Sequence, residues 1–176
     1  MLSVFDGLRD VTTLSVFVRL ACALICGGII GIERSYKRRP AGFRTHILIC
    51  IGAAITTLTS QYLYLNMHYF TDMARLGAQV VAGIGFIGAG TIIVTKRQRV
   101  KGLTTAAGLW TSAIIGLTFG GGFYEGGILA TVFIMLAELV FSRIEYRVLE
   151  NVPEINLYME YEDKHCLDAV SYTHLT

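Results

Sequence analysis

Two ionisable side chains lie inside long apolar runs, where a charge is costly and marks a functional or structural partnership. Arg19 lies within residues 11–32, and Glu138 lies within residues 126–141. At 1.5 Å per residue, Arg19 is about 12 Å and Glu138 about 18 Å from the start of its run. An extended arginine can bridge this offset, so we predict an Arg19–Glu138 ion pair. The alternative is that each side chain extends independently to the nearer membrane surface.

A second group of polar residues lies between the first two apolar runs. Glu33 and Arg34 end the first run, and Arg44, Thr45 and His46 begin the second. Arg44 and His46 are predicted to bind a phosphate or a lipid head group, helped by the free backbone N–H groups of a helix start. The alternative is structural: Arg44 anchors the helix at the membrane surface, and Thr45 caps it. Glu33 and Arg34 are expected at the end of the span, where long side chains reach the head groups.

The third apolar run contains a glycine motif with two interpretations. Gly83, Gly85 and Gly88 match the pattern G-x-G-x-x-G, and Gly90 follows. A dinucleotide site needs a preceding strand, a βαβ unit and an acidic residue about 20 positions later. The sequence shows none of these, so the glycines indicate close helix packing in a membrane.

Small residues in this run also share one helix face. They recur at spacings of four, three and four, and such a face lets another helix backbone approach closely, because packing drives helix association in lipid. Similar series occur in the first, fourth and fifth runs, which favours a tight bundle. The four residues of the third run are Ala78, Ala82, Gly85 and Ala89.

Three further residue types within the spans are predicted to be structural. Gln79 is expected to hydrogen-bond to another helix, for example to Thr56 or Thr104. Thr104 and Thr105 stand in the first turn of the fourth run. Trp110 is about seven residues into that run, too deep for the aromatic belt at the membrane surface. It is therefore expected to pack against a glycine face.

The whole composition indicates an integral membrane protein. Of 176 residues, 53% are hydrophobic and 16% are charged, whereas soluble domains carry about 25% charge. A spanning helix needs about 20 apolar residues. We therefore predict an all-α membrane domain, a bundle of five transmembrane helices in residues 1–142. The predicted spans are residues 11–32, 47–65, 76–95, 103–123 and 126–142.

The distribution of Lys and Arg predicts the orientation. The connection after the first span contains five basic residues and the connection after the third contains four, while the remaining short connections contain one or none. Cytoplasmic loops carry the excess of Lys and Arg. The N-terminus is therefore predicted outside and the C-terminus inside. Residues 39–45 and 99–105 also resemble each other, which suggests two parallel hairpin repeats; the alternative is that any basic loop needs a turn glycine and a capping hydroxyl.

The sequence beyond the fifth span has a different character. Residues 143–170 are rich in charge, and residues 155–161 alternate apolar and polar side chains, which is typical of a strand. One strand cannot form a domain alone, so we predict a linker and the beginning of a truncated α+β cytoplasmic domain. The last residues, 171–176, read as a foreign tail.

The acidic residues do not favour magnesium binding. Mg²⁺ is usually held by one or two carboxylates with several retained waters, and only Glu138 lies within the spans, with Glu33 at an edge. The chain also has no H-E-x-x-H, nucleophile-elbow or P-loop motif. We expect no metal site, no cofactor, no nucleic-acid partner and no enzymatic activity.

Several stretches together resemble the MgtC/SapB family of bacterial inner-membrane proteins, over about residues 10–142. The resemblance implies adaptation to low Mg²⁺, association with virulence, restraint of the F-type ATP synthase and contacts with other membrane proteins. Longer members carry an ACT-like C-terminal domain, which fits the strand near Ile155. The matching stretches are Arg19-Leu20, residues 31–34 (GIER), 40–46 (PAGFRTH), 78–90 (AQVVAGIGFIGAG) and 102–110 (GLTTAAGLW).

Three functional hypotheses follow. The first is a non-enzymatic regulator that binds another membrane complex, such as the F-type ATP synthase, through its helix faces. The second is an ion transporter, for Mg²⁺ or another ion, with a path along Gln79, Gly83 and the polar face of the fourth span. The third is a sensor of anionic lipid or phosphate at Arg44. Membrane lipid is an expected partner in each, and a homo-oligomer is left open.

Overall fold

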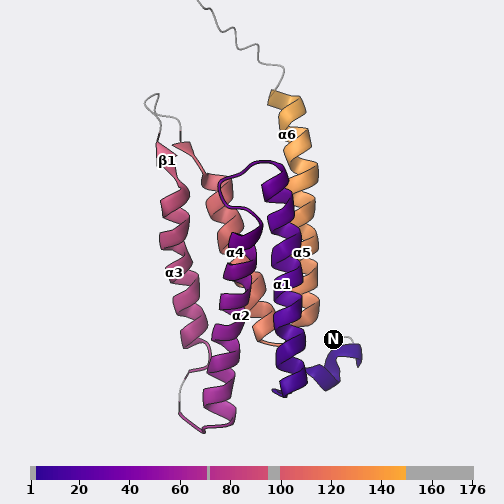
Figure 1. Cartoon of the computed structure of the whole chain (residues 1–176), viewed down its shortest axis with the longest axis vertical. Helices are drawn as coiled ribbons and strands as arrows, with labels where there is room; N and C mark the ends of the chain where they lie inside the picture. The colour runs from indigo at the N-terminus through magenta and orange to yellow at the C-terminus, as the bar shows by residue number, and fades with distance from the viewer. Residues whose placement is uncertain (1–2, 71, 95–99, 150–176) are drawn as a thin grey trace, which may run out of the picture. The chain divides into compact units, whose positions relative to one another are not determined.

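The computed structural model describes residues 3–70, 72–94 and 100–149 (Figure 1). The chain divides into two compact units, residues 1–139 and 140–176; the fold described here is that of the first. The predicted strand near Ile155 and the suspected tail lie outside the described residues. The elements are η1 (Ser3–Leu8), α1 (Thr13–Tyr36), α2 (Phe43–Leu65), α3 (Arg75–Thr91), β1 (Ile93–Val94), β2 (Val100–Lys101), α4 (Leu103–Gly120), α5 (Tyr124–Leu136), the π-helical turn η2 (Ala137–Phe141) and α6 (Ser142–Leu149).

The prediction of a mostly helical membrane protein is confirmed. Among the described residues, four helical stretches are long and apolar enough to cross a membrane: Thr13–Tyr36, Phe43–Leu65, Leu103–Gly120 and Tyr124–Ile144. α3 has 17 residues, at the lower limit of about 17 for a spanning helix. It is shorter than the predicted span because the chain becomes extended at Ile92, and β1 then pairs with β2 in a small antiparallel hairpin that was not predicted.

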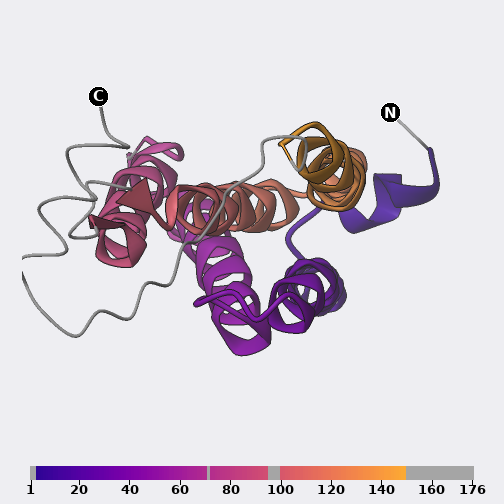
Figure 2. The ribbon, with the colours of Figure 1, turned by 90° about the horizontal axis from the view of Figure 1, so that it is seen from above.

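α4 is the central helix of the bundle. It contacts α1, α2, α3 and α5, and the view along the helices shows α3 and α5 on opposite sides of it (Figure 2). Two glycines bring α4 against the α2 backbone. A Cβ at Gly116 would lie 2.1 Å from the Cys50 carbonyl oxygen, and one at Gly120 would lie 2.5 Å from the Ala54 carbonyl oxygen. The predicted backbone-to-backbone packing is therefore present, because no side chain fits at these positions.

α1 packs against α2 in the same manner. A Cβ at Gly27 would lie 2.9 Å from the His46 carbonyl oxygen, and one at Gly31 would lie 2.7 Å from Phe43 Cα. The core between these helices consists of small side chains such as Ala23 and Cys50, both fully buried. The glycine and alanine series of α1 and α4 therefore set the geometry of the bundle.

α3 lies at the edge and packs on α4 through a different face from the one expected. Gly88 faces Ala106, and Ile84 is buried against the α2–α4 contact. By contrast, the predicted packing face points away from the other helices of the unit: Ala78, Ala82, Gly85 and Ala89 are all exposed. Within this unit, that expectation is wrong; the series of small residues remains on the exposed surface of α3.

Candidate functional site: two buried polar networks

Arg19 lies in the second turn of α1, toward the end of the bundle where α1 begins and α2 and α4 end, the lower end in Figure 1. The side chain is fully buried. Its Nη1 donates to Gln61 Oε1 at 2.7 Å and to the Gly120 carbonyl at 2.8 Å. Its Nη2 donates to the Arg9 carbonyl at 2.5 Å and to the Leu8 carbonyl at 3.4 Å. The guanidinium is thus surrounded by neutral oxygens from η1, α2 and α4.

The end of α4 supplies much of this stabilisation. Gly120 is the last residue of α4, so its carbonyl belongs to the partially negative end of the helix dipole. The turn that follows requires a glycine, because Gly122 has φ +77° and a Cβ there would lie 2.9 Å from Arg19 Nη2. Backbone dipoles therefore balance a charge that was expected to need a carboxylate.

The predicted Arg19–Glu138 pair is wrong. Glu138 Oε2 lies 2.7 Å from Arg34 Nη1 instead. α1 begins at Thr13 and α5 at Tyr124, which places Arg19 about 9 Å and Glu138 about 21 Å from the lower end. The offset of about 12 Å is twice that estimated from the apolar runs, because those runs do not begin where the helices begin.

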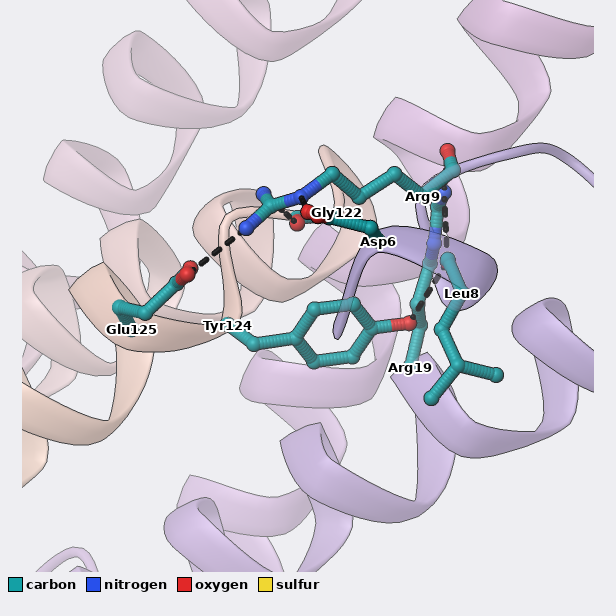
Figure 3. Close-up of polar contacts among 7 residues, drawn as sticks. All are labelled: Asp6, Leu8, Arg9, Arg19, Gly122, Tyr124 and Glu125. Carbon is teal, nitrogen blue, oxygen red and sulfur yellow. Dashed lines mark hydrogen bonds and ion pairs between the residues drawn. The ribbon is translucent and has the colours of Figure 1, made fainter. Parts of the chain in front are cut away.

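The N-terminal segment closes the lower end over Arg19 (Figure 3). Arg9 pairs with Glu125 at 2.7 Å, donates to the Gly122 carbonyl at 3.2 Å and pairs with Asp6 at 3.1 Å. The hydrogen bond to Asp6, followed by that to Glu125, raises the pKa of Arg9. Tyr124 donates to the Leu8 carbonyl at 3.1 Å. This closure was not predicted from the sequence, since η1 precedes the apolar run and carries no periodic pattern.

A second network joins α1 to η2 at the upper end. Arg34 is buried and, besides its bond to Glu138, donates from Nη2 to the Thr104 carbonyl at 3.0 Å. Lys37 lies 2.6 Å from Glu33 Oε1 and donates to the Glu138 carbonyl at 2.6 Å. Glu33 and Arg34 therefore do not reach for head groups as expected; they lie inside the protein and hold helices together.

The π-helical turn η2 explains how one residue serves both cations. A π-helical turn widens the helix locally and changes which groups meet along it, and such turns are frequent at functional sites. Glu138 stands at the second position of η2. Its carboxylate reaches Arg34 while its carbonyl accepts from Lys37. The turn thus presents a side chain and a backbone acceptor to the same end of α1.

The predicted phosphate site of Arg44 and His46 is wrong. His46 is fully buried, with Nδ1 2.9 Å from the Gly42 carbonyl, whereas Arg44 is exposed. Residues two positions apart on a helix point about 200° away from each other, so the side chains of Arg44 and His46 diverge. Thr45, half-buried, does not cap the helix: α2 has Gly42 as its N-cap residue, and the Phe43 N–H donates to Ser35 Oγ at 2.8 Å.

Three buried polar atoms near this network have no hydrogen-bond partner among the described residues: Arg34 Nε, His46 Nε2 and Glu33 Oε2. His46 Nδ1 must donate to the carbonyl, so Nε2 is an acceptor in the neutral ring. Gly108 leaves space beside two of them, since its Cβ would lie 3.7 Å from both Arg34 Nε and His46 Nε2. The interior of this network therefore contains buried polar atoms that the described residues leave without hydrogen bonds.

Other predicted residues remain outside both networks. Gln79 is exposed and has no hydrogen bond to Thr56 or Thr104 in the described part of the chain; Thr56 donates to the Gly52 carbonyl. Trp110 is 45% exposed, so it does not fill a glycine groove. Thr105 is buried and Thr104 is exposed. Of the glycine motif, only Gly88 packs; Gly83, Gly85 and Gly90 have no neighbour within 4 Å of a Cβ position.

These features define an integral membrane protein of the helical-bundle class. Within the described residues, no group of three or more His, Cys, Asp or Glu side chains could hold a metal ion. The chain belongs to the MgtC family: the family model matches residues 20–147. This range includes the whole network around Arg34 and Glu138. Arg19 and the N-terminal segment that covers it lie before the range.

Two relatives show the range of names in this family. The chain is 42% identical over 141 residues to "Putative magnesium transporter YhiD" of Escherichia coli (strain K12), covering 78% of this chain and 65% of the relative. It is 37% identical over 131 residues to "Protein MgtC" of Salmonella typhimurium (strain LT2), covering 74% of this chain and 54% of the relative. The chain thus spans little more than half to two thirds of these proteins. No solved structure matches.

Proposed function

We propose that this chain is a non-enzymatic regulator in the bacterial inner membrane, which acts by contacting another membrane complex. Membership of the MgtC family and the magnesium-related name of YhiD support a role in adaptation to low magnesium. The F-type ATP synthase is the first partner to test, because the family resemblance implies it. The proposal includes a multi-pass topology of five spans, with α3 as the shortest, the N-terminus outside and the C-terminus inside.

The exposed face of α3 carries this proposal. Ala78, Ala82, Gly85 and Ala89 lie on one side of the helix and are all exposed. Gly85 has no atom within 4 Å of its Cβ position. In a membrane, a face of small residues allows the backbone of another helix to approach closely. The glycines of α1 and α4 make such contacts inside the bundle, so this face of α3 is the one open to a partner helix.

An ion transporter is the alternative, and the name of YhiD favours it. Two observations weigh against a cation path through this bundle. Arg19 is a fixed positive charge at its lower end, and its hydrogen-bond partners among the described residues are all neutral oxygens; a like charge repels a cation strongly in a low dielectric. Gln79 and Gly83, expected along the path, are exposed on α3. A sensor of anionic lipid at Arg44 is the second alternative.

ATP-driven proton pumping in inverted membrane vesicles tests the regulator. Vesicles with equal ATP synthase content should pump less when the protein is present, without added proton leak. Gly85→Leu should abolish the effect, because it fills the small-residue face. Gly90→Leu is the matched control: its Cβ position is equally open, but it points about 80° away from Ala82, about 100° away from Ala89 and about 140° away from Gly85.

Each result separates the candidates. Unchanged pumping with the wild-type protein would remove the ATP synthase as the partner in that host. Loss of the effect in both variants would remove the α3 face as the contact surface. Flux of Mg²⁺ into liposomes that contain this protein alone would favour the transporter instead.

A further inference from the structure

An apolar groove separates α2 from α3. Its walls include Leu48 and Gly52 on α2 and Val80, Gly83 and Ile87 on α3, and Ala113 of α4 forms the floor. The groove has a volume of about 340 Å³. It is open because Gly52 and Gly83 have no side chains, and neither has an atom within 4 Å of its Cβ position. The groove is therefore accessible from outside the helical bundle.

The length and lining of the groove indicate what can occupy it. Val80 and Ile87 are seven residues apart, which corresponds to a length of about 10 Å. The residues that line the groove are all apolar, and non-bonded carbon atoms pack at about 3.5–4.0 Å. A stretch of one alkyl chain therefore matches the groove.

A positively charged side chain, that of Arg44, lies one helical turn beyond the end of the groove that Leu48 borders. Arg44 is exposed and precedes Leu48 by one helical turn and Gly52 by two, so the three residues share a face of α2. The rise from Arg44 to Leu48 is about 6 Å, a distance that a head-group phosphate and the first carbons of an acyl chain can cover. Arginine binds phosphate through charge-assisted hydrogen bonds.

We propose that this groove binds one acyl chain of an anionic phospholipid whose phosphate contacts Arg44. The site differs from the Arg44–His46 site expected from the sequence, because His46 points into the bundle and takes no part. It is also distinct from the small-residue face of α3, so a lipid and a partner helix can bind the same helix together. The assignment does not depend on the regulator function.

The single tryptophan of the chain provides the assay. Trp110 is half-exposed and lies one turn before Ala113 on α4. The wild-type protein would be reconstituted in phosphatidylcholine bilayers with increasing fractions of chain-brominated phosphatidylglycerol, which quenches tryptophan on contact. Brominated phosphatidylcholine in the same amounts measures contact with bulk lipid. We expect saturable extra quenching by phosphatidylglycerol.

Three variants test the two halves of the site. Arg44→Gln should raise the half-saturating fraction of phosphatidylglycerol about tenfold, the factor for losing one charge-assisted contact. Gly83→Leu fills the groove and should remove the extra quenching. Gly85→Leu, on the same helix and equally open but about 200° away from Gly83, should behave as wild type. The proposal is overturned if Gly83→Leu quenches as wild type does, or if phosphatidylglycerol and phosphatidylcholine quench equally.

Discussion

The ion pair between Arg34 and Glu138 leads to an asymmetric prediction. The Arg34 side chain is 1% exposed and that of Glu138 is 15% exposed, with 2.7 Å between Nη1 and Oε2. Glu138→Leu leaves a guanidinium buried with the Thr104 carbonyl as its remaining hydrogen-bond acceptor among the described residues. Stranding a buried charge costs about 3–5 kcal/mol, so we expect a loss of stability of that size.

The opposite substitution should cost less. Arg34→Met leaves Glu138 near the surface, where water and the neighbouring Lys37 can stabilise its carboxylate. We expect a loss of about 1–3 kcal/mol, the cost of an unsatisfied polar group. The double variant removes both charges together, and replacement of a buried pair by apolar residues is often neutral. It should therefore be more stable than Glu138→Leu alone.

Unfolding in detergent micelles measures these differences. Cys26 and Cys50 are free and buried, so a thiol-reactive fluorophore reports unfolding as they become accessible. Arg39→Met is the matched control, because Arg39 is exposed, and it should change stability by less than about 0.5 kcal/mol. The reasoning is refuted if Glu138→Leu costs no more than Arg34→Met, or if the double variant is less stable than Glu138→Leu.

Five further substitutions, at four positions, should separate packing from polar roles in the same unfolding assay. Gly116→Ala should destabilise by about 2 kcal/mol or more, since its Cβ would meet a carbonyl at 2.1 Å, whereas Gly90→Ala should stabilise by up to about 1 kcal/mol; equal effects would contradict the packing model. Arg19→Gln should cost about 2–3 kcal/mol, with Arg19→Lys recovering only part, because lysine cannot reproduce the planar set of donors. Ser35→Ala should cost about 1 kcal/mol by removing the acceptor for the first N–H of α2.

The helices could be predicted from the sequence because hydropathy over about 20 residues is a local property. The apolar runs give α1, α2, α4 and α5 to within a few residues, and the glycine series of α1 and α4 indicated close packing. The β1–β2 hairpin and η1 could not be predicted in this way. Residues as apolar as Ile93 and Val94 extend the third run, and their pairing with Val100 and Lys101 is a contact between separate segments that hydropathy does not record.

The polar networks were harder to predict, because depth in a membrane depends on where each helix begins. An error of two residues at the start of each of α1 and α5 moves Arg19 and Glu138 about 6 Å further apart along the bundle, and Glu138 pairs with Arg34 instead. Local dipoles add a second difficulty, since the partners of Arg19 include three backbone carbonyls. Every residue has a backbone carbonyl, so the sequence does not show which carbonyls will surround Arg19. A partner sought among the acidic side chains of the spans could only be Glu138.

The glycines show where the remaining functional information lies. Their spacing is similar in α1, α3 and α4, yet a Cβ would meet backbone at Gly27, Gly31, Gly116 and Gly120 and open space at Gly83, Gly85 and Gly90. The first set has a structural role, since close backbone contact at these glycines gives the bundle its shape. The second set contributes no contact within the unit, and in a helix each of its members is less favourable than alanine by about 1 kcal/mol. This loss of helix stability has a functional explanation if α3 binds other molecules. Gly83 borders the proposed lipid groove, and Gly85 belongs to the face proposed for a partner helix.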